Sequence, residues 1–305
     1  MRVFVTGASG HIGSGLVPEL LENGHQVVGL ARSDASAAAL EAAGAEVCRG
    51  TIDDLDTLRA AAAASDGVVH LAFKHEAMRT GDFLTAIADD LRAIKALGSG
   101  LEGSGKPFVG TGGTLTLAMA GISGRPGTEQ DVIGGGHRID AENELIGMAS
   151  RGVRSSYVRL PPIVHSSLDH HGFAHALIGM AAGSGVSAYV GDGANRWPSV
   201  HTLDAARLYR LALESAPAGS RLHGVADEGV PFRDIAEVIG RRLQLPVKSI
   251  DPQDAAAQFT FLAGFVGLDN PTSSAFTRQL LGWQPTHAGL IEELTHGHYF
   301  DGVAG

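Results

Sequence analysis

Short apolar runs alternate with amphipathic or alanine-rich stretches through the first half of the chain. The apolar runs predict buried parallel strands, at Arg2–Val5, Gln26–Ala31, Ala45–Cys48, Gly67–Ala72, Pro107–Thr111 and Ser155–Leu160. The stretches between them predict helices: one that carries Ile12 to Leu21 and stops at Gly24, and others at Ala35–Ala43, Asp54–Ala64, Asp82–Leu101 and Arg138–Ser150. This alternation predicts an α/β fold with a doubly wound parallel sheet, right-handed crossovers and helices on both faces.

The pattern of predicted elements changes after His165: the elements become shorter and the loops longer. The expected helices are Phe173–Ala182, Leu203–Ser215 and Phe232–Leu243, and the expected strands are Ser187–Val190 and Leu222–Val225. Four further elements are expected at Val247–Ile250, Asp254–Val266, Ser274–Leu281 and Ala288–Leu294. We therefore expect one domain over residues 1–165 and a smaller α/β lobe over residues 166–305, with some elements of the lobe returning to the main sheet.

Composition excludes several classes of protein. The 305 residues carry a formal charge of −10, which argues against a general nucleic-acid binder. The single cysteine, Cys48, allows neither a disulfide framework nor a cysteine zinc site. No apolar run is long enough for a membrane span, and the N-terminus lacks the pattern of a signal peptide. We expect a cytoplasmic protein that binds neither membranes nor nucleic acid and acts on a small molecule.

A glycine-rich turn, Thr6 to Gly13, joins the first strand to the first helix. Glycines let the backbone approach a ligand closely, and the free N–H groups and positive dipole end of a helix attract a pyrophosphate. This context predicts that residues 1–165 bind a dinucleotide, although a tight turn that binds nothing is the alternative. The candidate contacts in the turn are Gly7, Ser9, Gly10, His11, Ile12 and Gly13.

The end of the second predicted strand bears on the choice of cofactor. A carboxylate there would hydrogen-bond the ribose hydroxyls of NAD, but this chain has Arg32 and Ser33. A guanidinium and a hydroxyl suit the 2′-phosphate of NADP, because arginine binds phosphate bidentately. The sequence therefore favours NADP, with an exposed Arg32 that simply pairs with Asp34 as the alternative.

The glycine spacing, with Thr-Gly at its head, resembles the extended short-chain dehydrogenase/reductase superfamily of the NAD-dependent epimerase/dehydratase type. The resemblance implies a Rossmann domain and a nicotinamide cofactor. It also implies that Thr51 and Ile52 lie near the adenine, where the superfamily usually has an aspartate in the place of Thr51. Three residues of the segment VHLAF would line the cofactor: Leu71, Ala72 and Phe73. His70, on the same strand, is expected to be a structural core histidine.

The resemblance weakens at the reaction centre. The superfamily uses a serine or threonine after the fifth strand and a tyrosine followed by lysine four residues later. None of the four tyrosines of this chain has a lysine at that position. Alignment on Glu142 puts Arg138 in the place of the lysine and Gly134 in the place of the tyrosine. The degenerate site resembles atypical subgroups of the superfamily that keep NADP binding and often lack the tyrosine.

Three residues are candidates for the reaction itself. Gly113 or Thr114 falls near the place of the serine, and Thr114 offers a hydroxyl. Arg138 could hold the ribose hydroxyls as a cation, but its pKa is too high for it to serve as a base. His137 could act as an acid near neutral pH, with an unoriented loop histidine as the alternative.

Further candidates lie around the second half. The segment RLPPIVH resembles the strand end that borders nicotinamide, which suggests Pro161 for the cofactor and His165 for the substrate. Arg196 and Trp197 resemble residues at the substrate mouth, and Lys74 follows a strand at its carboxyl end. Adjacent histidines at residues 170–171 lack the spacing of metal ligands, so no metal is expected.

Two functions remain open from the sequence. The first is an NADP-dependent oxidoreductase or epimerase/dehydratase-like enzyme that acts on a small carbonyl or hydroxyl compound. The second is a redox-sensing regulator that binds NADP without catalysis, which the missing tyrosine and lysine favour. A homodimer through the helices Asp82–Leu101 and Arg138–Ser150 is also possible, since both carry apolar residues on more than one side.

Overall fold

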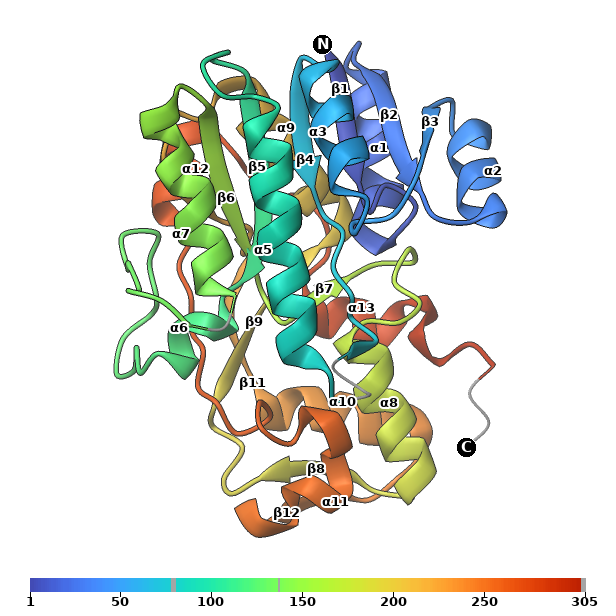
Figure 1. The fold of residues 1–305 in the computed structure, drawn as a ribbon. Coiled ribbons are helices and arrows are strands. Elements are labelled where there is room, and N and C mark those ends of the chain that lie inside the picture. Colours follow the sequence, from blue (N-terminus) through green and yellow to red (C-terminus); the bar gives the residue numbers. More distant parts are fainter. Residues whose placement is uncertain (78–80, 137, 303–305) are drawn as a thin grey trace.

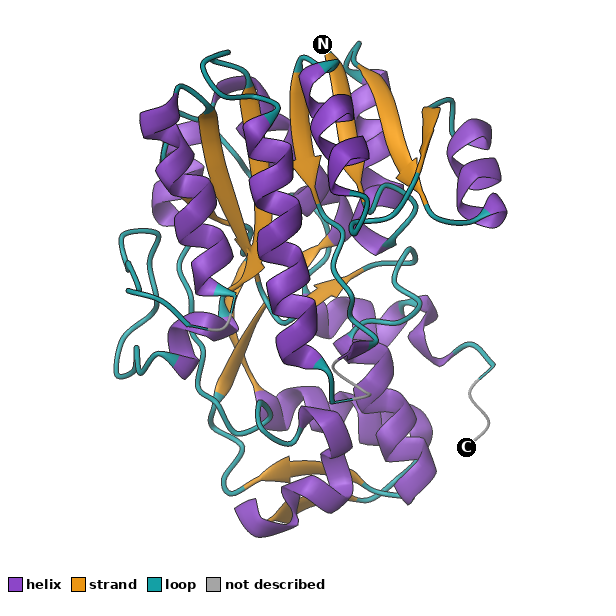
Figure 2. Ribbon diagram, in the orientation of Figure 1, coloured by secondary structure: helices purple, strands orange, loops and turns teal. Residues whose placement is uncertain are grey.

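The computed structural model describes residues 1–77, 81–136 and 138–302. Its largest element is a seven-stranded sheet of order β10-β6-β5-β4-β1-β2-β3, in which every neighbouring pair is parallel (Figures 1 and 2). The strands are β1 (Arg2–Thr6), β2 (Gln26–Ala31), β3 (Glu46–Arg49), β4 (Gly67–His70), β5 (Pro107–Gly113), β6 (Arg154–Leu160) and β10 (Ser220–His223). The order reverses between β1 and β4, where doubly wound sheets bind their ligands. The predicted fold class is therefore confirmed.

Helices cover both faces of this sheet (Figure 1). One face packs against α1 (His11–Glu22), α2 (Asp34–Ala42), α9 (Thr202–Ser215) and α12 (Ala275–Leu281). The other face packs against α3 (Leu55–Ala63), α5 (Phe83–Ser99) and α7 (Ile139–Gly147), which is followed by the 3-10 turn η1 (Met148–Arg151). The apolar strand residues are buried on both sides, as the continuous apolar runs predicted.

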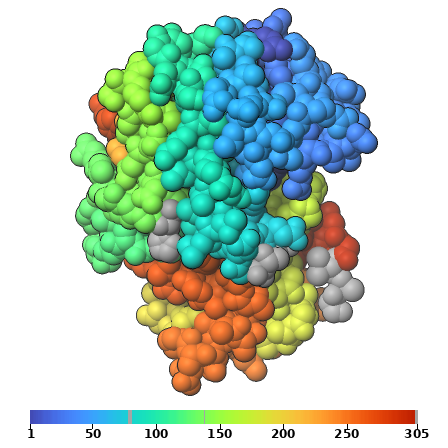
Figure 3. Space-filling model, in the orientation of Figure 1, coloured from blue at the N-terminus to red at the C-terminus, as the bar shows by residue number. Residues whose placement is uncertain are grey.

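A smaller lobe lies below the main sheet in the view of Figures 1 and 3. Its strands form two small sheets: β7 (Ile163–His165), β9 (Arg196–His201) and β11 (Asp227–Pro231) in one, β8 (Ser187–Val190) and β12 (Val247–Ile250) in the other. Its helices are α8 (Phe173–Ser184), α10 (Phe232–Leu243), α11 (Ala255–Phe259) and α13 (Leu290–His296), with the 3-10 turns η2 (Pro252–Asp254), η3 (Thr260–Leu262) and η4 (His298–Phe300). A separate core centred on Trp197 and Phe232 holds the lobe together.

Three elements of the second half lie with the main sheet. Strand β10 extends the sheet beside β6, α12 packs against β10 and α9, and α9 packs along α1. The two helices approach closely because Gly15 has no side chain: a Cβ there would lie 3.3 Å from the Thr202 methyl group. The division of the chain at residue 165 stays a prediction.

The element predicted over Asp254–Val266 is divided, because Thr260 has a φ of 45° and separates α11 from a 3-10 turn. Strands β7, β9 and β11 were missed, as was the five-residue helix α6 (Leu115–Met119). The three strands pair with one another across distant segments of the chain, and no local pattern reports that pairing.

The predicted dimer helices use most of their apolar residues inside the chain. Ile94 and Leu97 of α5 and Leu145 of α7 are fully buried. Leu84, near the start of α5, is 78% exposed. The homodimer stays a prediction. No helix within residues 1–77, 81–136 and 138–302 is long and apolar enough to cross a membrane.

Candidate functional site

The glycine turn is as tight as its sequence suggests. Gly7 has a φ of 69°, and a Cβ on it would lie 2.8 Å from the backbone nitrogen of Ala72 on the neighbouring strand. A Cβ on Gly13 would lie 2.3 Å from the Gly7 carbonyl oxygen. Gly10 caps α1, and no side chain hydrogen-bonds to the helix end there. The amide groups of the first helical turn are thus available to an anion, as a pyrophosphate site requires.

His11, the first residue of α1, links the turn to the lobe. Its Nε2 lies 2.7 Å from the hydroxyl of Thr202, and its Nδ1 lies 3.7 Å from the Asp169 carboxylate. Burial lowers the pKa of His11 below its ordinary value, although Asp169 opposes the shift. Ser9 is exposed, and Ile12 is half-buried. The turn and the lobe therefore meet at the end of the sheet where a dinucleotide would lie.

Arg32 stands free at the end of β2. It is exposed and forms no ion pair with any residue in the described part of the chain. Asp34 does not pair with it, since that carboxylate lies 2.8 Å from the guanidinium of Arg49. Ser33 caps α2, and its hydroxyl accepts a hydrogen bond from the backbone nitrogen of Ser36. A free guanidinium thus remains at this strand end for an anionic ligand.

The expected adenine residues follow β3. Ile52 is buried, and Thr51 is partly exposed. The Thr51 hydroxyl donates to the Asp54 carboxylate at 2.9 Å, and its backbone nitrogen donates to the same oxygen at 2.6 Å. Asp54 therefore holds the loop shape, and its side chain does not cap the following helix α3.

A buried chain of polar groups begins at the glycine turn and crosses the sheet. Thr6 lies 2.7 Å from Nδ1 of His70, and the Nε2 of that ring lies 3.1 Å from the carboxylate of Asp90. All three side chains are fully buried or nearly so. Both ring nitrogens of His70 are hydrogen-bonded, so the residue is structural, as expected from the sequence. Asp90, on α5, was not a sequence candidate.

Arg138 ends this chain of contacts. Its guanidinium lies 3.3 Å from the Asp90 carboxylate and donates a 2.8 Å hydrogen bond to the carbonyl oxygen of Thr111. It also stacks over the ring of Phe73, 4.1 Å from the ring centroid. Burial opposes the charge, but the Asp90 carboxylate keeps the pKa of Arg138 above its ordinary value. A permanent cation is therefore fixed at the carboxyl ends of β4 and β5.

Leu71, Ala72 and Phe73 follow β4 and are partly exposed, as residues that line a ligand should be. The backbone nitrogen of Ala72 donates to the Thr6 hydroxyl at 3.2 Å. This hydrogen bond joins the segment to the strand that leads into the glycine turn, so the pyrophosphate turn and the end of β4 form one continuous edge.

The threonine hydroxyls near the end of β5 already have partners. Thr114 is fully buried, and its hydroxyl accepts a 2.9 Å hydrogen bond from Asn270. Thr111 donates to the His70 carbonyl oxygen at 2.7 Å and accepts from the Tyr209 hydroxyl at 2.8 Å. His137 lies outside the described residues. The catalytic roles of Thr114, His137 and Arg138 stay predictions.

Tyr157, on β6, was not a sequence candidate, yet it points toward the end of β5. Its hydroxyl is buried and has no hydrogen-bond partner among the residues that the structure describes. A Cβ on Gly112 would lie 2.8 Å from this hydroxyl, so the glycine makes room for the ring. Burial raises the pKa of Tyr157 above its ordinary value, which keeps the hydroxyl neutral.

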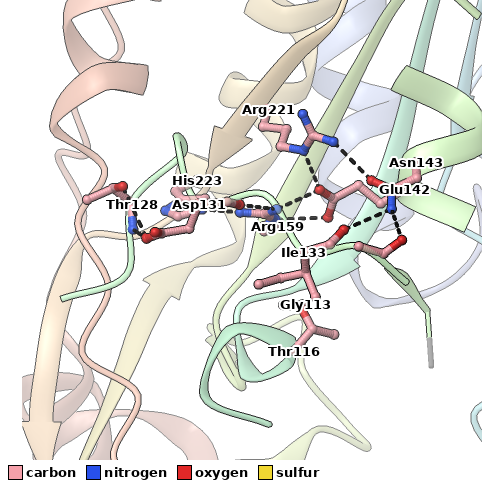
Figure 4. A network of polar contacts seen from close by, with 11 residues as sticks. Gly113, Thr116, Thr128, Asp131, Ile133, Glu142, Asn143, Arg159, Arg221 and His223 are labelled. Atoms are coloured by element: carbon pink, nitrogen blue, oxygen red, sulfur yellow. Dashed lines mark hydrogen bonds and ion pairs between the residues drawn. The ribbon is translucent and has the colours of Figure 1, made fainter. Parts of the chain in front are cut away.

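A buried ion network anchors the helix that begins after Arg138 (Figure 4). Glu142 accepts two hydrogen bonds from Arg159, at 2.8 and 2.5 Å, and one from Arg221 at 2.6 Å. His223 lies 3.3 Å from Arg159, and burial lowers its pKa to about 3, so it is neutral and accepts. The network connects α7 to β6 and β10. It therefore fixes the position of Arg138, which directly precedes α7.

The substrate candidates of the sequence differ widely in exposure. Lys74 pairs with Asp53 at 2.8 Å and with Asp89 at 2.5 Å. Arg196 is partly exposed and pairs with Asp269 through two hydrogen bonds, at 3.0 and 2.8 Å.

Pro161, His165 and Trp197 are buried. Trp197 packs in the core of the lobe, and neither ring nitrogen of His165 has a partner among the described residues. Neither His165 nor Trp197 presents a surface to a substrate in this structure. The roles of the five candidates Lys74, Pro161, His165, Arg196 and Trp197 stay predictions. In the described ranges, no group of three or more His, Cys, Asp or Glu side chains could hold a metal ion.

Comparisons with known proteins agree with this geometry. Residues 3–88 match the model of the NAD dependent epimerase/dehydratase family. An uncharacterized protein of Schizosaccharomyces pombe is 47% identical, over 98% of this chain and the whole of that protein. An uncharacterized protein of Saccharomyces cerevisiae is 43% identical, over 96% of this chain and 98% of its own.

Solved structures share the fold. The dTDP-glucose 4,6-dehydratase DesIV of Streptomyces venezuelae, with NAD and TYD bound, superposes with a TM-score of 0.77 at 18% identity, over 98% of this chain and 97% of its own. Residues 3–88 match the NAD dependent epimerase/dehydratase family, and over nearly its whole length the chain is related to the two yeast proteins.

Proposed function

We propose that this protein is an NADP-dependent oxidoreductase or epimerase/dehydratase-like enzyme that acts on a small carbonyl or hydroxyl compound. The observation that carries the choice of cofactor is the free guanidinium of Arg32 at the end of β2. A carboxylate at this place would favour the ribose hydroxyls of NAD, whereas an unpaired cation favours the 2′-phosphate of NADP. The glycine turn supplies the pyrophosphate site for either cofactor.

In this proposal, different residues of the chain bind the cofactor and supply the proton. NADPH, when bound, would supply a hydride to the carbonyl carbon of the substrate. Arg138, held by Asp90 and stacked on Phe73, binds the ribose beside the nicotinamide as a permanent cation. The alcohol oxygen takes its proton from a water molecule, from His137 or from Thr114. Of these, Thr114 is fully buried and accepts a hydrogen bond from Asn270, which leaves its own proton to donate.

The second candidate is a regulator that binds NADP and does no chemistry. Two features favour the regulator. Arg138 stands where the superfamily has a lysine, and Gly134, four residues earlier, stands where it has a tyrosine. An arginine in that place cannot pass on a proton, because it does not titrate.

Nucleotide binding and turnover separate these two functions. NADPH should raise the melting temperature more than NADH at equal concentration, because stabilisation grows with affinity. Arg32→Ala should remove the difference, whereas Arg241→Ala, an exposed arginine in the lobe, should not. NADPH oxidation across a set of small aldehydes and ketones then tests catalysis. Tight NADPH binding without turnover on any carbonyl would favour the regulator.

A further inference from the structure

A second arginine stands beside Arg32 at the edge of the sheet. Strands β2 and β3 are parallel, and Arg49 is the direct register partner of Ala31. Register partners on neighbouring strands are about 5 Å apart, so the end of β3 brings Arg49 next to the residue that precedes Arg32. The sequence separates the two arginines widely, and only the strand pairing shows that they are neighbours.

The side chain of Arg49 turns toward the start of α2. Its guanidinium lies 2.8 Å from the carboxylate of Asp34, the first residue of that helix and the second residue after Arg32. Both partners face solvent, with side chains that are 55% and 99% exposed. An exposed ion pair of this kind contributes little to stability and exchanges readily for a stronger anion.

The local charge suits a dianion. Two arginines lie at this edge of the sheet beside the positive end of α2, and Asp34 is the carboxylate that pairs with one of them, Arg49. A ribose 2′-phosphate carries nearly two negative charges and offers three acceptor oxygens, so one arginine leaves it incompletely neutralised. The neighbouring Asp54 forms no ion pair with either arginine in the described part of the chain, and its carboxylate accepts two hydrogen bonds from Thr51.

We propose that Arg49 and Arg32 together form a clamp for the 2′-phosphate of the cofactor, and that Asp34 holds Arg49 until the phosphate replaces it. The inference rests on the proposed binding of NADP. It assigns Arg49 as a residue that determines cofactor choice and Asp34 as a competitor for the same cation. Substitutions at the two positions should therefore change the affinity in opposite directions.

The test is a fluorescence titration with NADPH and NADH and a calorimetric titration with adenosine 2′,5′-bisphosphate. Arg49→Ala should weaken NADPH and the bisphosphate about tenfold, because it removes a charge-assisted contact to phosphate. NADH binding should stay within about twofold, because NADH has no 2′-phosphate to lose a contact. Asp34→Asn should tighten NADPH about threefold, because it frees Arg49 and removes a repelling charge.

The chain offers a matched control. Arg59 and Asp56 form an ion pair on α3 with nearly the same exposure, 51% and 96%. Arg59→Ala and Asp56→Asn should leave the affinity for all three ligands unchanged. Melting temperatures of the four variants without ligand should agree with that of the wild type, because both pairs are exposed.

The outcomes distinguish a failure of the clamp from a failure of the proposed NADP binding. If Arg49→Ala weakens NADPH and NADH equally, Arg49 contacts the adenine or the pyrophosphate, and the clamp is wrong. An unchanged affinity for NADPH in Arg49→Ala also overturns the clamp while NADP binding stands. If the wild type binds NADH as tightly as NADPH, or binds neither, the proposed cofactor is wrong and the clamp falls with it.

Discussion

The proposed cofactor site has an adenosine end, with Arg32 and Arg49, and a reaction end, with Arg138. The arginines of the two ends differ in burial and in their partners. At the adenosine end, Arg32 is exposed and unpaired among the described residues, and Arg49 forms one exposed ion pair. At the reaction end, Arg138 is held by a fully buried carboxylate, a carbonyl oxygen and an aromatic ring. Both ends carry cations, but only at the adenosine end are the guanidinium groups exposed and available to bind a ligand.

The difference also concerns how the residues come together. The adenosine end depends on neighbours within a few residues and on one strand pairing. The reaction end depends on contacts between Thr6, His70, Asp90 and Arg138, which come from four segments of the fold. A change at the first end should therefore alter specificity, and a change at the second should alter stability as well as binding.

The largest effect should come from the turn that both ends share. Gly13→Ala places a Cβ 2.3 Å from the Gly7 carbonyl oxygen, and a backbone atom cannot move aside cheaply. The turn must distort, and we expect the affinity for NADPH and NADH to fall by about 100-fold or more, since the pyrophosphate binds there. Fluorescence titration measures the loss. Gly179→Ala, in α8 with open space around it, is the control and should bind like the wild type.

The next largest effect should separate the two ends. Asp90→Asn leaves the buried guanidinium of Arg138 without its charge partner, and breaking a buried ion pair costs about 3–5 kcal/mol of unfolding free energy. Urea unfolding measures the loss, with the exposed Asp82→Asn at the start of the same helix as the control.

The folded variant should also bind NADPH more weakly while keeping its affinity for adenosine 2′,5′-bisphosphate, which does not reach Arg138. A destabilisation below about 1 kcal/mol would mean that Arg138 keeps enough solvent to do without Asp90.

Local pattern was enough to predict the strands that carry the adenosine end. The bounds of β2 agree with the sequence to the residue, and those of β1 differ by one, because their apolar runs leave little choice. The glycine turn and the free strand-end Arg32 follow from residues that are adjacent in the chain. Structure added Arg49, whose place depends on the register between β2 and β3.

The reaction end could not be predicted in the same way. Thr114 seemed available as a hydroxyl, but Asn270, 156 residues later, hydrogen-bonds to it. Asp90 belongs to no motif of the sequence, yet it is fully buried beside His70. Trp197 resembled a substrate residue, and the structure puts it in a core. Such pairings depend on how distant segments pack, and no local pattern reports them.

Acid should weaken the protein through its buried histidines. Burial lowers the pKa of His165 from 6.5 to about 4. Between these two pH values the unfolded chain binds a proton that the folded protein does not, so stability falls as the pH falls from 6.5 to 4. One such histidine accounts for about 3 kcal/mol over that range.

Melting temperature against pH measures this slope. His165→Leu should flatten it and cost little at pH 7, since neither ring nitrogen has a partner among the described residues. His25→Leu is the control: this histidine lies 2.9 Å from the carboxylate of Glu214, so its loss should not flatten the slope in the same way. If His165→Leu keeps the full slope, the titration belongs to other groups.

The smallest effect concerns Arg196, which pairs with Asp269 near the lobe. The two side chains are 42% and 37% exposed, so their ion pair should contribute only about 0.5–1 kcal/mol to stability. Arg196→Ala should therefore shift the urea midpoint slightly and leave NADPH binding unchanged, because the adenosine and reaction ends both lie in the other part of the molecule. Asp269→Asn serves as its partner control and should give a loss of similar size.

If Arg196 binds substrate as its sequence context suggests, Arg196→Ala should instead raise KM for a turned-over carbonyl. Asp269→Asn should raise KM less, since the neutral asparagine leaves the guanidinium in place. Equal KM values for both variants and the wild type would limit Arg196 to a surface ion pair.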